Sequence, residues 1–160
     1  MIISPWIKDR LMQAHWFKVE NLLKRKVKVF IGYGITKRRG DEEADARDNG
    51  ERTIEFFTRL AQTYPDFMHF VKLGDTHAKV LLKDNDTLIA GSFNWMSFGG
   101  MDRAANGANV IRDEVSILVS EPREVEKMFK RYVARFAKFD RKLEAYLGGK
   151  PSEGDAPIRP

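Results

Sequence analysis

Segments with helical periodicity alternate with strand-like segments along the first half of the chain, and this alternation constrains the fold most. Residues 2–5 and 27–31 are predicted strands, and residues 11–26 between them carry apolar side chains at helical spacing. A second helix is predicted at residues 51–64, ended by Pro65. Further strand-like segments follow at residues 67–73, 77–82, 88–93 and 114–119. This order predicts an α/β protein whose mixed sheet is covered by helices on both faces.

A long amphipathic helix is predicted after the last strand. Ser120 is a candidate N-cap, Pro122 suits the first turn, and the apolar face continues to Leu147. The polar stretch 36–50 lacks periodicity, so we expect a surface loop there. A chain of 160 residues fits one domain. We therefore expect a single domain over residues 1–147 and a loose tail, rich in proline, glycine and charge, over residues 148–160.

The chain is basic, with 28 Lys and Arg against 23 Asp and Glu and a net charge of +5. A basic field attracts polyanions such as nucleic acid, although a charge this small also fits simple solubility. The chain has no cysteine, which excludes disulfides, thiolate nucleophiles and cysteine metal sites. The sequence has no signal-peptide pattern and no run of about 20 apolar residues. We expect a soluble, cytoplasmic protein without a membrane span.

Residues 77–95 bring together the side chains that suit phosphate chemistry. His77 and Lys79 are two apart on a predicted strand, so they share one face. The turn-forming residues 83–86 reverse the chain, and the next strand ends with Ser92 and Asn94, which also share a face. The hairpin therefore predicts a nucleophile or base, a cation and two hydrogen-bonding groups close together. Such a set suits a phosphoryl group in transfer, whose charge lies on several oxygens.

The spacing of these residues resembles the HKD motif of the phospholipase D superfamily, which reads His-x-Lys, four residues, Asp, six residues, Gly-Ser-x-Asn. The specified positions are all filled, by His77, Lys79, Asp84, Gly91, Ser92 and Asn94. Six such matches arise by chance on the order of once in a million chains. The resemblance implies a phospholipase D-like α/β/α sandwich with a mixed sheet.

The resemblance also implies a role for each residue. His77 is the nucleophile or general acid, and Lys79, Ser92 and Asn94 hold the phosphate oxygens. Asp84 and Gly91 are structural members of the motif. Glu114 is similar to the acidic residue that accepts a hydrogen bond from the histidine ring. The chemistry so implied needs no metal ion and no cofactor.

The family active site uses two such motifs, and this chain has one. His15 and His69 are followed two residues later by Phe17 and Val71 instead of lysine, and both histidines are expected to be packing or surface residues. Small endonucleases of the family form homodimers that share one site, and we expect the same here. The alternative is that the chain is the second half of a longer protein whose first half supplies the other motif.

The function expected from these features is a metal-independent phosphodiesterase with a phosphohistidine intermediate. We expect a nuclease whose partner is nucleic acid, with DNA favoured over RNA. A phospholipase D-type lipid phosphodiesterase or phosphatidyltransferase is the alternative within the enzyme class. A domain that binds nucleic acid within a larger defence or repair protein is the alternative outside it. Cations of the last helix are expected to form its polar surface: Lys127, Arg131, Arg135 and Lys138.

Overall fold

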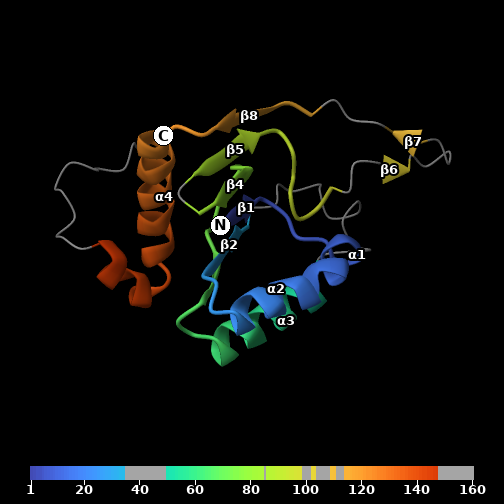
Figure 1. Ribbon diagram of the computed structural model, residues 1–160. Coiled ribbons are helices and arrows are strands. Elements are labelled where there is room, and N and C mark those ends of the chain that lie inside the picture. Colours follow the sequence, from blue (N-terminus) through green and yellow to red (C-terminus); the bar gives the residue numbers. More distant parts are fainter. Residues whose placement is uncertain (35–49, 85, 99–101, 104–108, 111–113, 148–160) are drawn as a thin grey trace.

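A six-stranded mixed sheet forms the centre of the computed structural model, which describes residues 1–34, 50–84, 86–98, 102–103, 109–110 and 114–147 (Figure 1). The strand order is β3 (Met68–Lys72), β2 (Val29–Tyr33), β1 (Ile2–Ser4), β4 (Val80–Lys83), β5 (Thr87–Gly91) and β8 (Ser116–Val119). The first three strands are parallel, while β4, β5 and β8 pair antiparallel with their neighbours. The predicted single-domain α/β architecture with a mixed sheet is confirmed. The sequence did not predict the short pair β6 (Asp102–Arg103) and β7 (Asn109–Val110).

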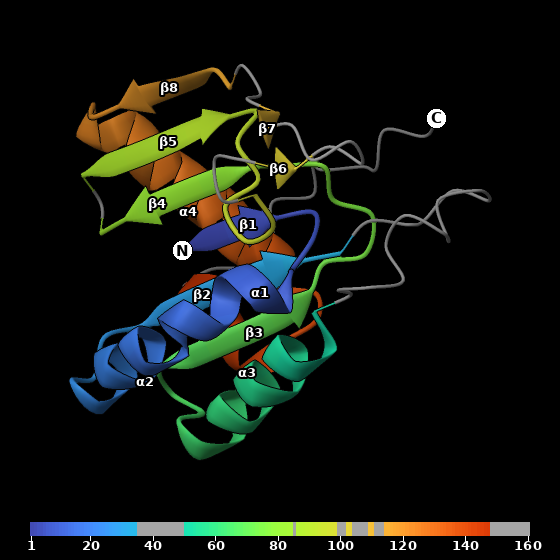
Figure 2. The same cartoon turned by 90° about the vertical axis from the view of Figure 1, so that its right-hand side faces the viewer.

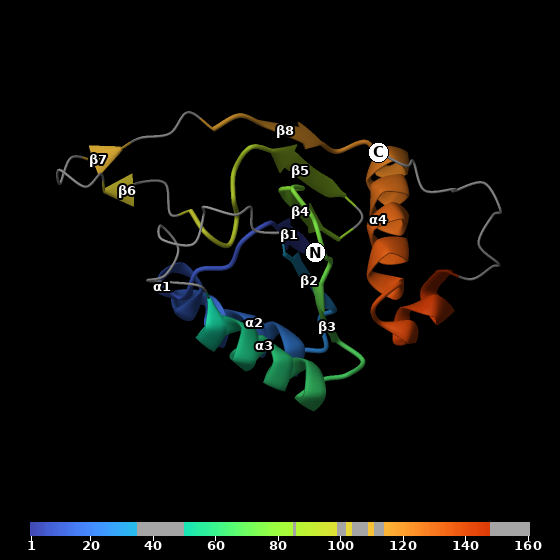
Figure 3. The same cartoon turned by 180° about the vertical axis from the view of Figure 1, so that it is seen from behind.

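Helices cover both faces of this sheet (Figures 1 and 3). On one face lie α1 (Asp9–Met12), the 3-10 turn η1 (Gln13–His15), α2 (Trp16–Lys24) and α3 (Glu51–Thr63). On the other face lie α4 (Pro122–Ala137) and the 3-10 segment η2 (Arg141–Leu147). Successive side chains of a strand point to opposite faces, so Phe30 is buried under α4 while Ile31 is buried under α2 and α3. None of the described helices is long and apolar enough to cross a membrane.

The last helix is shorter than the sequence predicted. Glu121, and not Ser120, is its N-cap residue, although Pro122 does begin the helix. The predicted continuation to residue 147 was wrong, because α4 ends at Ala137 and η2 follows after a break. The carboxylate of Asp140 explains the break: one oxygen accepts a hydrogen bond from the Lys142 amide at 3.1 Å, and the other lies 2.9 Å from Nδ1 of the buried His69. The tail predicted at residues 148–160 and most of the loop predicted at 36–50 lie outside the described residues.

Two other predicted boundaries were also wrong. The helix predicted at residues 11–26 is divided into α1, η1 and α2. The strand predicted at residues 27–31 starts two residues later, because Lys26 adopts a positive φ of 62° and the Val27 amide closes the end of α2 on the Leu22 carbonyl. Gly32 lies inside β2, where a Cβ atom would collide with the side chain of Leu73. The predicted end of this strand at residue 31 was therefore also wrong, because β2 continues through Gly32 to Tyr33.

Asp9 of α1 caps the N-terminus of α3 from outside that helix. Its Oδ1 accepts hydrogen bonds from the backbone amide of Thr53 at 2.8 Å and from Oγ1 of Thr53 at 2.7 Å, and Oδ2 accepts one from the Arg52 amide at 3.3 Å. A carboxylate at a helix N-terminus satisfies free amides and interacts favourably with the helix dipole. Burial alone would raise the pKa of Asp9, but the hydrogen bonds from Thr53 outweigh it, and the pKa is lowered below its usual 3.8.

The Asp9→Ala variant should be less stable than the parent protein by about 1 kcal/mol at neutral pH, because α3 loses its cap. The lowered pKa means that the carboxylate contributes stability above pH 3.8 and that this contribution disappears as the pH falls through the pKa of the folded state. Urea unfolding of both proteins at several pH values tests this expectation. A stability difference that grows toward low pH would contradict it.

Candidate active site

The candidate site lies where four neighbouring strands start or end at the same edge of the sheet. β1 ends at Ser4 and β5 ends at Gly91, while β4 starts at Val80 and β8 starts at Ser116. Figure 2 shows these ends on the side of the sheet that faces β6 and β7. Because the strand order is β1-β4-β5-β8, residues just outside these ends gather along one edge. The motif residues before β4 and after β5 therefore come to the same edge as Glu114.

The motif residues flank the strands, and the predicted strand boundaries were wrong here. His77 and Lys79 precede β4, and Ser92 and Asn94 follow β5, so strict strand alternation does not place them. The Gly91 amide still donates to the Lys79 carbonyl at 3.3 Å, which continues the hairpin pairing beyond β4. The antiparallel hairpin itself is confirmed, and Val80 and Leu82 of β4 are buried.

His77 and Lys79 are in direct contact. The Lys79 ammonium donates to the His77 carbonyl at 3.0 Å and lies 3.3 Å from Nδ1 and 3.5 Å from Nε2 of the ring. An ammonium group only donates hydrogen bonds, so a ring nitrogen that pairs with it must carry a lone pair. Such a hydrogen bond can form only with the neutral imidazole, which is also the form that can act as a nucleophile. The His77 side chain is exposed, and the indole of Trp6 lies against it edge to face at 6.2 Å between ring centroids.

Lys79 is a charged group at this edge that is partly shielded from water. Its side chain is half-buried, and this burial lowers the pKa of Lys79, while the negative charge of Glu114 acts in the opposite direction. Glu114 therefore acts on Lys79 as a nearby negative charge. Among the described residues no hydrogen bond joins Glu114 to the His77 ring, so the expected pairing of these two residues stays a prediction.

Gly91 and Ser92 hold the beginning of β8. The Ser92 hydroxyl accepts a hydrogen bond from the Val115 amide at 2.9 Å and donates to the Val115 carbonyl at 3.3 Å. A Cβ atom on Gly91 would collide with the Val115 carbonyl and lie 2.5 Å from Oγ of Ser116. The structure thus gives Ser92 a backbone-binding role next to Glu114. Its expected contact with a substrate oxygen stays a prediction.

Asn94 is the most deeply buried motif residue after β5, with 8% of its surface exposed. Its backbone carbonyl accepts hydrogen bonds from the Ser97 and Phe98 amides at 3.1 and 3.0 Å, which fixes the turn that follows. Its side-chain Oδ1 is buried and has no hydrogen-bond partner among the described residues. A buried amide oxygen without a partner is costly. The backbone therefore fixes Asn94 at this edge, and within its side-chain amide only the NH2 group could donate a hydrogen bond to a phosphate oxygen.

Sequence reasoning missed two polar groups at this edge. Ser4 is the last residue of β1 and is fully buried, with an Oγ that has no partner among the described residues. Since Ile3 pairs with Val80, Ser4 lies beside the backbone of Lys79. Trp6 follows two residues later and covers one side of His77. The strand register could have revealed both residues, but the sequence alone does not show that β1 pairs with β4.

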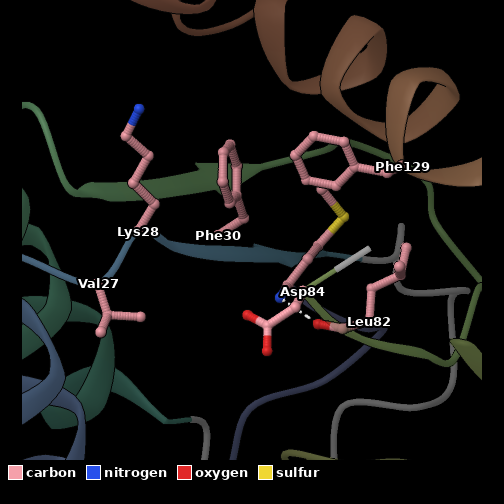
Figure 4. A pocket seen from close by; sticks show the side chains of 7 residues that line it. Val27, Lys28, Phe30, Leu82, Asp84 and Phe129 are labelled. Carbon is pink, nitrogen blue, oxygen red and sulfur yellow. Dashed lines mark hydrogen bonds between the residues drawn. The ribbon is translucent and has the colours of Figure 1, made fainter. Parts of the chain in front are cut away.

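Asp84 lies at the opposite end of the hairpin from His77. It adopts a positive φ of 51° just after β4, a conformation that aspartate tolerates better than most residues. Its carboxyl group lines a pocket of about 320 Å³ together with Lys28, Leu82 and Phe129, while the Met1 amino group donates to the Leu82 carbonyl at 2.6 Å (Figure 4). This pocket contains none of the other motif residues, so it is separate from the candidate site.

The Ser92→Ala variant should unfold at a temperature lower by about 2 to 4 °C, because the hydroxyl contributes two hydrogen bonds to the start of β8. Thermal unfolding followed by circular dichroism measures this shift. Thr87→Ala is the control, because within the described part of the chain the Thr87 hydroxyl donates only to its neighbour Asp86. An unchanged melting temperature for Ser92→Ala would show that Ser92 does not hold β8.

Among the described residues, no group of three or more His, Asp or Glu side chains is placed to hold a metal ion. Comparisons of the chain with protein-family models, with curated proteins and with solved structures gave no match. The functional interpretation therefore rests on the motif at residues 77–94 and on the geometry of the edge where it lies.

Proposed function

We propose that the protein is a metal-independent phosphodiesterase that cleaves nucleic acid, with a phospholipase D-like fold and one HKD motif per subunit. The observation that carries the proposal is the contact between His77 and Lys79, with an ammonium group 3.3 Å from Nδ1 of an exposed imidazole. A neutral imidazole can attack phosphorus, and an ammonium beside it can stabilise the charge that develops on the phosphoryl oxygens.

The proposed reaction proceeds in two displacements at phosphorus. A nitrogen of His77 attacks phosphorus, the bond to the leaving oxygen breaks, and a protonated imidazole supplies the proton that this oxygen takes up. Water then attacks the phosphohistidine, the second imidazole accepts the proton from water, and the phosphorus–nitrogen bond breaks. Lys79 and the amide of Asn94 would hold the non-bridging oxygens in both steps, and Glu114 would orient the imidazole.

The second imidazole comes from a second copy of this chain in our proposal. The free edge of β8 is not suited to bring two His77 side chains together. Two copies paired edge to edge through β8 would separate their β4 strands by five strand spacings, about 24 Å in all. We therefore propose that the two-fold axis passes next to the strand ends at His77. Val115, which is 72% exposed beside Ser92, offers apolar surface for such an interface.

Nucleic acid is the preferred substrate in this proposal. The net charge of +5 favours a polyanion, and phosphodiester oxygens are the groups that Lys79 would bind. A phospholipid also contains a phosphodiester, so a lipid phosphodiesterase or phosphatidyltransferase remains the second candidate on chemical grounds. A domain that only binds nucleic acid has no need for a neutral imidazole in contact with an ammonium group.

The parent protein should cleave plasmid DNA, single-stranded DNA or RNA in the presence of excess EDTA, and His77→Asn should abolish the cleavage with the fold retained. Lys79→Ala should reduce the turnover number about a hundredfold, since one preorganised donor to the phosphoryl oxygens is lost. The assay includes phosphatidylcholine vesicles as a separate substrate. His15→Asn is the matched control, because His15 lies in η1 outside the motif, and it should keep full activity.

Strict dependence on magnesium or manganese, or cleavage by His77→Asn at the parent rate, would contradict the proposed chemistry. Cleavage of phosphatidylcholine without cleavage of any nucleic acid would replace the proposed substrate by a lipid. Circular dichroism of each variant excludes unfolding as the reason for lost activity.

The protein should sediment as a dimer at micromolar concentration, because one motif supplies only one of the two imidazoles that the reaction uses. Activity per chain should fall when the protein is diluted below the dissociation constant of the dimer. Sedimentation velocity and a dilution series of the cleavage rate test this expectation. A fully active monomer would contradict it.

A further inference from the structure

His77 lies on the connection from β3 to β4. This connection, residues 73–79, is not part of any strand of the sheet. The strand order β3-β2-β1-β4 means that residues 73–79 must pass the ends of β2 and β1 to reach the start of β4. Figure 2 shows this connection as the green loop between the arrowhead of β3 and β4. Two backbone hydrogen bonds attach it to the end of β2: the Leu73 amide donates to the Tyr33 carbonyl at 2.7 Å, and the Thr76 amide donates to the Gly34 carbonyl at 2.8 Å.

Arg135 of α4 binds the same connection from the other face of the sheet. One guanidinium nitrogen, Nη1, donates to Oγ1 of Thr76 at 3.2 Å. The other, Nη2, lies 3.3 Å from the Asp75 carbonyl and 3.5 Å from the Leu73 carbonyl. The planar guanidinium thus contacts three of the four residues that precede His77. The sequence interpretation of Arg135 as ordinary polar surface was wrong, because the side chain points to this loop and is half-buried.

Thr76 links Arg135 to the motif through hydrogen bonds of its hydroxyl group. Its side chain is 1% exposed, so Oγ1 is shielded from water. The same oxygen that accepts from Arg135 also accepts from the Ala78 amide at 3.4 Å, and Ala78 stands between His77 and Lys79. By contrast, the hydrogen-bond and ring contacts of the exposed His77 ring within the described part of the chain are those with Lys79 and Trp6. The position of the His77 backbone therefore depends on the residues before it.

The backbone of Arg135 is held by the core. Its neighbours on α4, Val133 and Phe136, are 2% and 0% exposed and pack in the core between α4 and the sheet. The planar guanidinium then loses less freedom per hydrogen bond than a lysine ammonium would when it binds carbonyl and hydroxyl oxygens. We propose that Arg135, acting through Thr76, is a positioning residue that holds His77 and Lys79 in the geometry needed for phosphoryl transfer. This inference rests on the proposed function of the motif.

Arg135→Met and Thr76→Val should each reduce kcat for phosphodiester cleavage about tenfold or more, while KM changes less than twofold, because small displacements of a nucleophile slow the chemical step. Thr76→Ser keeps the hydroxyl and should retain activity near the parent level. The double variant Arg135→Met/Thr76→Val should be no slower than the slower single variant, since both substitutions interrupt one connection. Arg131→Met is the matched control on the exposed surface of α4 and should match the parent.

Hydrogen exchange of the Ala78 amide gives a readout that does not depend on activity. It should be faster in Arg135→Met and Thr76→Val than in the parent and in Arg131→Met, at a temperature where all four proteins are folded. If the parent protein cleaves phosphodiesters but both variants keep its kcat, the inference is overturned while the proposed function stands. If the parent cleaves no phosphodiester, the proposed function fails, and unchanged Ala78 exchange in both variants would then overturn the positioning contact as well.

Discussion

The backbone pairing of β4 with its neighbours is the constraint on which the candidate site depends. β4 pairs with β1 on one side and β5 on the other, and β5 pairs with β8, so the ends of four strands are brought to one edge. None of the motif side chains lies in the middle of a strand. They occupy the few residues just outside the strand ends. The backbone there is no longer part of a regular strand, but it is directly attached to residues that are. The glycine at position 91 permits the close approach of β8 that brings Glu114 near Lys79.

Each face of the sheet has its own hydrophobic core, and the two cores affect the site in different ways. The face under α1, α2 and α3 has a core of its own, and Asp9 links α1 to the start of α3 within it. The face under α4 has a second core, in which Phe136 is fully buried beside the strands. Burial of such a side chain stabilises a protein by about 2 kcal/mol, which favours this placement of α4 on the sheet. From its place on α4, Arg135 binds the loop before His77. The packing of α4 on one face of the sheet is thereby coupled to the geometry of the site.

Much of the fold could be predicted from the sequence, because periodicity reports burial directly. The helix at residues 51–64 and the strand at residues 67–73 were predicted nearly to their ends. The helix buries apolar side chains at helical spacing, and the strand is packed on both faces of the sheet. Boundaries were wrong where tertiary contacts decide them. Lys26 adopts a left-handed conformation, Asp140 pairs with His69 just after the last helix ends, and β2 continues through Gly32, where a Cβ atom would collide with Leu73.

The candidate site could be predicted only in part, because the spacing of residues along the chain does not show which distant segments come together. Spacing along the chain brings His77 next to Lys79, and the structure places the two in contact. The contributions of Trp6, Ser4 and Arg135 come from segments far apart in the sequence. Only the strand order and the packing of α4 bring them to His77 and the residues next to it. No local pattern distinguishes Arg135 from the other cations of its helix, since its role depends on what lies opposite it.

The central claim is that His77 forms a covalent bond to phosphorus. Acid-free quenching of a single turnover with DNA in excess EDTA, followed by digestion and mass spectrometry at alkaline pH, measures this directly, because phosphohistidine is stable under those conditions. The account predicts a nucleotide adduct on the peptide that contains His77, which accumulates and decays within one turnover. Cleavage of DNA with no adduct on His77 at any time in the turnover would contradict it.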